Sequence, residues 1–184
     1  MTAVPGSRAP MGGSPTGART WRLRKTATEL GAMVPAALRA SLHHIDTAQV
    51  YRNEDAVGDL VAASKIPRSG LFLTTKVWVA NYPARSFAVS VNESLKRLRT
   101  DYVNLLLLHW PSNAVPLDEQ IAGLETAVKA GKARNVGVNN FNGAMVAEAT
   151  RLSSVPLATN QFEYHPYLNQ KIAIEATQRA GLSA

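Results

Sequence analysis

Apolar and polar residues alternate along this chain with two different periods. Short apolar runs of strand length are followed by stretches in which apolar residues recur every three or four positions, the spacing of an amphipathic helix. The runs predict strands at 20–23, 43–48, 71–76, 103–109, 133–140 and 156–161. The stretches predict helices at 28–40, 53–65, 84–99, 117–131, 143–152 and 169–181. We therefore expect six strand–helix units in succession.

Local features refine several of these elements. Residues 103–109 are almost continuously apolar, which is typical of a strand buried on both faces. Gly131 and Gly181 predict the ends of two helices, because glycine readily adopts the left-handed conformation that follows a helix. Pro35 lies inside the first helical pattern, so that helix is expected to start late or to be kinked. The buried face of the helix at 84–99 is predicted to consist of Phe87, Val91, Ser94, Leu95 and Leu98.

This alternation favours parallel strands joined by right-handed crossovers. An open doubly wound sheet usually carries a glycine-rich phosphate loop after its first strand, and neither GxGxxG nor GxxxxGK[ST] occurs here. A (β/α)8 barrel needs no such loop and places its functional groups at the carboxyl ends of its strands. We therefore predict an α/β fold of the (β/α)8 TIM-barrel type, incomplete with about six units, over residues 18–184.

Composition and charge exclude several classes of protein. The chain has 184 residues, of which 46% are hydrophobic and 18% are charged, which is ordinary for a globular domain. It has no cysteine, so no disulfide framework or thiolate metal site is possible. No apolar run is long enough to cross a membrane, and a cytoplasmic location is expected.

The net charge of +7 is concentrated near the beginning of the chain. Residues 1–40 carry six basic residues and one acid, a balance that also fits a transit peptide. Only Trp21 lies among these cations as an aromatic residue, which argues against nucleic-acid binding. Residues 1–17 are rich in Gly, Pro and Ser, so we predict a disordered N-terminal tail.

Polar or ionisable residues stand at the carboxyl ends of five successive predicted strands. In chain order they are Asp46, Lys76, His109, Asn139 with Asn140, and Asn160 with Gln161; Tyr51 lies in the loop after the first of these strands. Taken alone, Asp46 could cap a turn, Tyr51 could be a packing residue, and His109 could be a core histidine. Because strand ends of a parallel barrel meet at one rim, we expect these groups to lie together.

The combination fits proton donation to a carbonyl. A phenol is a poor acid at neutral pH, but a nearby ammonium favours its phenolate form. A carboxylate can hold that ammonium in place, and an imidazole can orient the carbonyl oxygen or relay a proton. The reduced carbon also needs a hydride, which no side chain supplies, so a nicotinamide cofactor is expected. Asn140 and Gln161 suit the carboxamide of that nicotinamide.

The sequence resembles the aldo-keto reductase family from about Gly17 to the end of the chain. The matching stretches are HIDTAQVYRNEDAVG, LFLTTKVW, SLKRLRTDYVNLLLLHWP, GKARNVGVNNF and NQFEYHPYL, and they look most similar to the bacterial branch that includes the 2,5-diketogluconate reductases. The resemblance implies reduction of an aldehyde or ketone with NADPH, without metal or flavin.

The same resemblance assigns roles to individual residues. It implies a catalytic tetrad of Asp46, Tyr51, Lys76 and His109, with Tyr51 as the acid. It implies cofactor contacts by Thr20, Asp46, Asn139, Asn140 and Gln161. It implies a substrate pocket formed by Trp21, Trp78, His109 and Trp110.

Some features depart from the family pattern. The family continues with two more strand–helix units that complete its cofactor site, so we expect weak NADPH binding, impaired turnover and self-association through open barrel edges. Two functions stay open: a working carbonyl reductase, or a non-catalytic protein that binds a partner on the same scaffold.

Ser41 stands where the family commonly has glycine, which would cost stability if that residue needs a positive φ. Asn104 stands in place of a common Asp.

Overall fold

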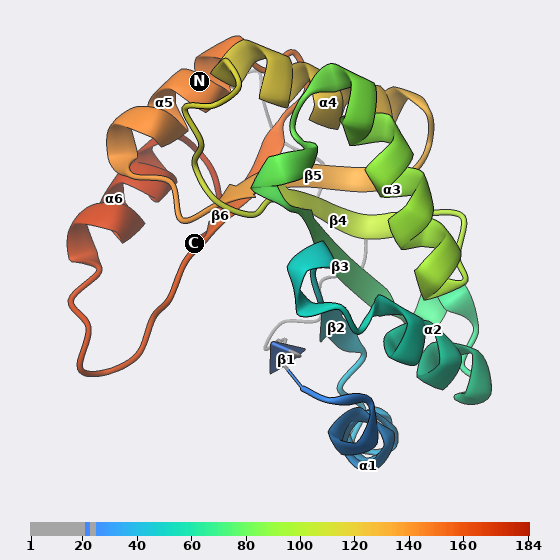
Figure 1. Ribbon diagram of the computed structural model, residues 1–184. Helices are drawn as coiled ribbons and strands as arrows, with labels where there is room; N and C mark the ends of the chain where they lie inside the picture. Colours follow the sequence, from blue (N-terminus) through green and yellow to red (C-terminus); the bar gives the residue numbers. More distant parts are fainter. Residues whose placement is uncertain (1–20, 23–24) are drawn as a thin grey trace, which may run out of the picture.

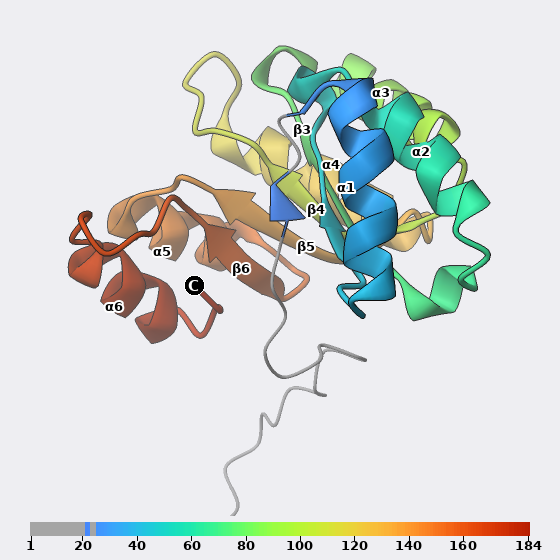
Figure 2. The same ribbon diagram turned by 90° about the horizontal axis from the view of Figure 1, so that it is seen from below.

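The computed structural model describes Trp21, Arg22 and residues 25–184. Six parallel strands form one curved sheet, and the helices cover its outer side (Figure 1). Figure 2 shows α1 beside α2 and α2 beside α3 around the outside of the sheet. The predicted tail at 1–17 lies outside the described residues.

The strands and helices alternate as the sequence predicts. The strands are β1 (Trp21–Arg22), β2 (His44–Asp46), β3 (Phe72–Val77), β4 (Val103–Leu108), β5 (Ala133–Asn139) and β6 (Leu157–Gln161). The α-helices are α1 (Ala27–Arg39), α2 (Glu54–Ala63), α3 (Ala84–Leu98), α4 (Leu117–Lys129), α5 (Gly143–Leu152) and α6 (Lys171–Arg179). Three short 3-10 helices, η1 (Gln49–Tyr51), η2 (Arg68–Gly70) and η3 (Val79–Asn81), lie in the connections.

The strand order identifies the architecture. The strands lie in the sheet in the order β1-β2-β3-β4-β5-β6, the same as their order in the chain. A doubly wound sheet would reverse direction at a switch point, whereas a barrel adds each strand on the same side. The prediction of an incomplete (β/α)8 barrel is therefore confirmed. Helix α1 does not start late: it begins at Ala27 and contains Pro35.

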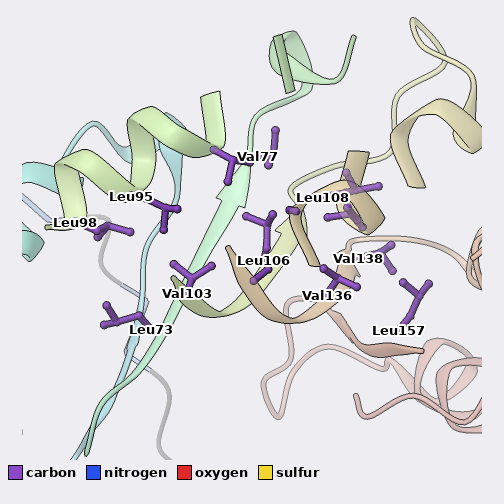
Figure 3. Close-up of a cluster of buried hydrophobic side chains, with 14 of the residues drawn as sticks. Leu73, Val77, Leu95, Leu98, Val103, Leu106, Leu108, Val136, Val138 and Leu157 are labelled. Atoms are coloured by element: carbon purple, nitrogen blue, oxygen red, sulfur yellow. The ribbon is translucent and has the colours of Figure 1, made fainter. Parts of the chain in front are cut away.

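A hydrophobic core fills the space between the sheet and its helices. Figure 3 shows side chains of β3, β4, β5 and β6 meeting those of α3 in one cluster. The five residues predicted to form the buried face of α3 are all buried. Because each strand packs its outward side chains on helices, its inward side chains and its ends are left for other roles.

The outer edge of β6 is partly covered. Ser183 pairs in parallel with Thr159. The backbone N–H of Asn160 donates to the Ser183 carbonyl at 3.1 Å, and the Ser183 N–H donates to the Ala158 carbonyl at 3.0 Å. Self-association through sheet edges stays a prediction.

The amino ends of the strands are fastened by the half-buried guanidinium group of Arg68. Arg68 Nη2 donates to the side-chain oxygen of Asn104 and to the Tyr102 carbonyl, both at 2.8 Å. The Asn104 oxygen also accepts the Leu73 N–H at 3.0 Å. Burial lowers the pKa of Arg68. Asn104, where the family commonly has an Asp, thus serves as a neutral acceptor that ties η2 to β3 and β4.

Four helices end in the same hydrogen-bonded motif: α3, with Arg99 at φ of 53°, and the helices α1, α4 and α6. After α1, the N–H of Ser41 donates to the Leu38 carbonyl and the N–H of Leu42 donates to the Ala37 carbonyl, each at 3.0 Å. This is a Schellman motif, which requires a left-handed residue after the helix. Gly131 and Gly181 fill that position after α4 and α6 with φ of 71° and 75°, whereas Ser41 fills it with φ of 60°. Ser41 therefore has the positive φ at which serine is less favourable than glycine.

We expect Ser41→Gly to stabilise the protein by about 0.5–1 kcal/mol, because glycine removes the clash of a Cβ in the left-handed region. The reciprocal change, Gly131→Ser, should destabilise it by a similar amount, since a Cβ at Gly131 meets no atom within 4 Å and only the backbone conformation differs. Urea unfolding of the two variants measures both effects. Equal stability of all three proteins would show that the motif tolerates serine without strain.

His44 lies partly buried on β2, on the same face as Asp46. Its Nε2 is 3.0 Å from the Thr74 hydroxyl, and its ring meets the Phe72 ring edge-on, with 4.6 Å between centroids. Burial lowers the pKa of His44 from its ordinary 6.5, with Asp46 opposing and Lys76 adding to this effect. The folded chain therefore binds a proton at His44 less readily than the unfolded chain does.

This depressed pKa predicts a pH-dependent stability. Above the ordinary pKa of 6.5, His44 does not reduce the free energy of unfolding. As the pH falls toward the lower pKa of the folded state, the free energy of unfolding declines, because the unfolded chain then binds more protons. The free energy of unfolding should thus decrease from pH 7 to mildly acidic pH. His44→Gln should flatten this decrease in urea titrations at each pH. An equally steep decrease in the variant would assign it to other groups.

Candidate functional site

A buried ion pair joins β2 and β3 at their carboxyl ends. Asp46 is the last residue of β2, and Lys76 lies near the end of β3. Lys76 Nζ donates to Asp46 Oδ1, and both side chains are completely buried. Lys76 Nζ also donates to the Thr47 carbonyl at 3.2 Å. Because the ion pair is shielded from water, its geometry is held more strictly than that of a surface ion pair.

The phenol and the imidazole lie beside this ion pair. Tyr51 belongs to η1, the short helix after β2, and Lys76 Nζ lies 5.3 Å from the centre of its ring. His109 directly follows β4, is buried, and donates its backbone N–H to the Val77 carbonyl at 3.1 Å. The rings of Tyr51 and His109 meet edge-on, with 5.5 Å between centroids. The structure thus brings Asp46, Tyr51, Lys76 and His109 together.

Two predicted amides extend the arrangement across the barrel interior. Gln161 Nε2 donates to Asp46 Oδ2 at 2.8 Å, and Asn139 Nδ2 donates to Gln161 Oε1 at 3.1 Å. Lys76, Asp46, Gln161 and Asn139 therefore form one hydrogen-bonded chain that runs from β3 to β5. Asn139 is buried, and its Oδ1 has no hydrogen-bond partner in the part of the chain that the structure describes. This atom is an acceptor left available at the rim.

The two other polar residues at strand ends differ in role. Asn140 has a left-handed backbone with φ of 63°, and its Nδ2 donates to the His109 carbonyl at 3.3 Å. Asn160 is buried elsewhere: its side chain bonds to the backbone N–H and carbonyl of Phe141 and to the Thr177 hydroxyl. Asn160 therefore ties β6 to the segment before α5 and to α6, and it does not join the hydrogen-bonded chain.

A cavity of about 700 Å³ opens beside Tyr51 and His109. The predicted substrate residues Trp78 and Trp110 line it, and the Trp78 and His109 rings meet edge-on at 5.4 Å. Thr20 and the side chain of Trp21 lie outside the described residues. The lining also includes charged or polar residues that sequence analysis missed, namely Lys25, Thr26, Glu29, Arg52 and Asp55.

A signal for part of this lining is present in the sequence. Thr26 and Glu29 form a capping box, in which each side chain bonds to the other's backbone N–H. The pattern Thr-x-x-Glu would have predicted the start of α1. In the structure this start lines the cavity. No comparable signal marks Tyr82, which is fully buried and whose hydroxyl donates to the Trp110 carbonyl at 2.8 Å and accepts its N–H at 3.2 Å. Burial raises the pKa of Tyr82.

The described part of the chain lacks the features of a metal centre and of a membrane-spanning helix. Among residues 25–184 and the short β1, no group of three or more His, Cys, Asp or Glu side chains could hold a metal ion. Within the same residues, no helix is long and apolar enough to cross a membrane.

Comparisons with known proteins agree with this geometry. The family model described as "Aldo/keto reductase family" matches residues 11–183. Methylglyoxal reductase DkgB of Salmonella typhi is 40% identical over 154 residues, which cover 82% of this chain and 58% of that protein. An aldo-keto reductase of Mycobacterium ulcerans is 45% identical over 138 residues, 74% of this chain and 49% of that protein. The chain thus spans about half to three-fifths of the length of these relatives.

Solved structures give the same result. A crystal structure of a putative 2,5-diketo-D-gluconic acid reductase B superposes with a TM-score of 0.88 and 48% identity, covering 90% of this chain and 59% of that one. A Bombyx mori aldo-keto reductase in complex with NADP superposes with a TM-score of 0.81 and 31% identity, covering 86% of this chain and 55% of that one. From sequence, fold and site together, the chain belongs to the aldo-keto reductase family, in the bacterial branch that includes the 2,5-diketogluconate reductases.

Proposed function

We propose that this chain carries the proton-donating side of a carbonyl reductase, which reduces an aldehyde or ketone to an alcohol with NADPH. The observation that carries the proposal is the buried Asp46–Lys76 ion pair next to Tyr51 and His109, on the wall of an open cavity. Membership of the aldo-keto reductase family supports it.

In this proposal Tyr51 is the general acid. Its hydroxyl gives a proton to the carbonyl oxygen, and the positive charge of Lys76 beside the ring stabilises the phenolate that remains. Asp46 pairs with Lys76 and holds it in place, because a fully buried charge without a partner is costly. His109, packed edge-on between Tyr51 and Trp78, orients the carbonyl oxygen.

The amides at the rim fit the carboxamide group of a nicotinamide ring. The free acceptor of buried Asn139 suits an amide N–H, and the side chains of Asn140 and Gln161 stand at the same rim. These three residues would hold the carboxamide. When bound, NADPH supplies the hydride that no side chain can provide. The Bombyx mori relative that was solved with NADP supports this choice of cofactor.

The names of the relatives suggest the first substrates to try. Methylglyoxal and 2,5-diketo-D-gluconate are small oxygenated carbonyl compounds. They appear in the names of the relatives that are 40% and 48% identical to this chain. The indole rings of Trp78 and Trp110 offer an apolar wall to such a compound, while the carbonyl faces Tyr51.

The first test is an NADPH titration of the chain followed by intrinsic tryptophan fluorescence. Trp78 lines the cavity, so we expect saturable quenching. Addition of methylglyoxal should then consume NADPH, and Tyr51→Phe should lower the rate by about 10²–10⁴-fold, the usual contribution of general acid catalysis.

Tyr167→Phe is the matched control for this substitution, because Tyr167 is 96% exposed in the loop between β6 and α6. It should keep the parent's rate. Reduction that continues unchanged in Tyr51→Phe would contradict the assignment of the acid. Absence of both quenching and NADPH consumption in a chain that is folded by circular dichroism would contradict the proposed function.

A further inference from the structure

The side-chain amide of Gln49 is fully hydrogen-bonded to groups of α3 and of the segment 78–81. Its Oε1 accepts the backbone N–H of Trp78 at 2.8 Å and the side-chain amide of Asn81 at 3.0 Å. Its Nε2 donates to the Ser90 carbonyl and to the Ser94 hydroxyl, both at 3.2 Å. A glutamine amide has two donor hydrogens and two acceptor lone pairs, so every position is satisfied. These bonds connect η1 with η3 and α3, which follow it by about 30 to 45 residues.

The position of Gln49 relates it to the proposed acid. Gln49 and Tyr51 are the first and last residues of η1, and Trp78 directly precedes η3. Tyr51 and Trp78 both meet His109 edge-on, at 5.5 Å and 5.4 Å between centroids. A single amide thus fixes the loop that bears the phenol relative to the loop that bears the indole.

Packing alone gives η1 little support. None of its three residues is buried, and no side chain caps it. Polar bonds support its conformation, among them those of Gln49 and, next to it, those between Asn53 and the Thr47 hydroxyl and Lys25 carbonyl. A segment with no buried residue opens more readily than the core beneath it.

We propose that Gln49 is a positioning residue that sets the placement of Tyr51 against Trp78 across the mouth of the cavity. Gln49 makes these bonds whether or not the chain catalyses a reaction. Their consequence for catalysis rests on the proposed function: loss of the amide would displace the proton donor from the wall that receives the carbonyl compound.

The test is the rate at which tetranitromethane nitrates each tyrosine, measured by peptide mass spectrometry without cofactor or substrate. Gln49→Leu replaces the amide with an apolar side chain and removes all its hydrogen bonds. We expect nitration of Tyr51 to rise about fivefold relative to the exposed Tyr164 and Tyr167, the factor for losing the bond that links Gln49 to Trp78, taken as about 1 kcal/mol net. Circular dichroism should stay at the parent's value.

Two matched variants separate positioning from a general effect. Ser94→Ala removes one bond of Gln49 on α3 but leaves the link to Trp78, so Tyr51 should react as in the parent. Gln178→Leu makes the same substitution at an exposed position of α6 and should also change nothing. If NADPH consumption is measurable, kcat of Gln49→Leu should fall about fivefold, in parallel with the nitration change.

Two outcomes would overturn the inference. One is a Tyr51 nitration rate in Gln49→Leu equal to that of the parent. The other is a parallel rise at Tyr51 and at fully buried Tyr82 with loss of the circular dichroism signal, which would mean that Gln49 supports only the fold. Neither depends on whether the chain reduces carbonyls, so this inference and the proposed function can fail separately.

Discussion

The buried Asp46–Lys76 ion pair imposes the strictest condition on this structure. Removing a carboxylate and an ammonium from water costs several kcal/mol for each ion, even in a real protein. The expense is offset here by direct pairing, by the Thr47 carbonyl that accepts from Lys76, and by Gln161, which donates to the other oxygen of Asp46. Removing Asp46 or Lys76 would leave a buried charge uncompensated. Removing Gln161 would take away the donor to the second oxygen of Asp46.

This condition extends to the curvature of the sheet. Gln161 ends β6 and Asp46 ends β2, and three strands separate β6 from β2 in the sheet. Their side chains meet at 2.8 Å only because the sheet curls so that its strands converge on one interior. The same curl requires helices on the outer face alone, where the apolar residues of β3 to β6 find their partners. The hydrophobic core lies on the outer face of the strands and the ion pair on their inner face, so both depend on the same curvature of the sheet.

The sequence was sufficient to predict the strands and the groups at their ends, for a physical reason. A parallel barrel brings all carboxyl strand ends to one rim, so the rim residues could be identified without knowing any contact. The alternation of side chains along a strand limits what can be predicted about each rim residue. Asn160 and Gln161 are adjacent, so their side chains point to opposite faces. Only Gln161 reaches Asp46, whereas Asn160 bonds to Phe141 and Thr177 on the outer side. Polarity at a strand end shows that a residue is at the rim, but the direction of its side chain comes from the register.

Residues in the loops were beyond this kind of prediction. Gln49 and Tyr82 have partners that lie 28 or more residues away, and no local pattern indicates which backbone groups they will meet. Their effect is nevertheless specific. Gln49 fixes the loop with Tyr51 to the start of η3, and Tyr82 fixes the backbone of Trp110 next to His109. Two walls of the cavity are thus fastened within the chain itself, and under the proposed function this preorganisation would lower the cost of aligning a carbonyl with Tyr51. The loop between β6 and α6 differs, since Tyr164 and Tyr167 are 69% and 96% exposed there. The bonds that fasten the site therefore lie on the side of Tyr51, the proposed proton donor, where small displacements of a hydroxyl would matter most.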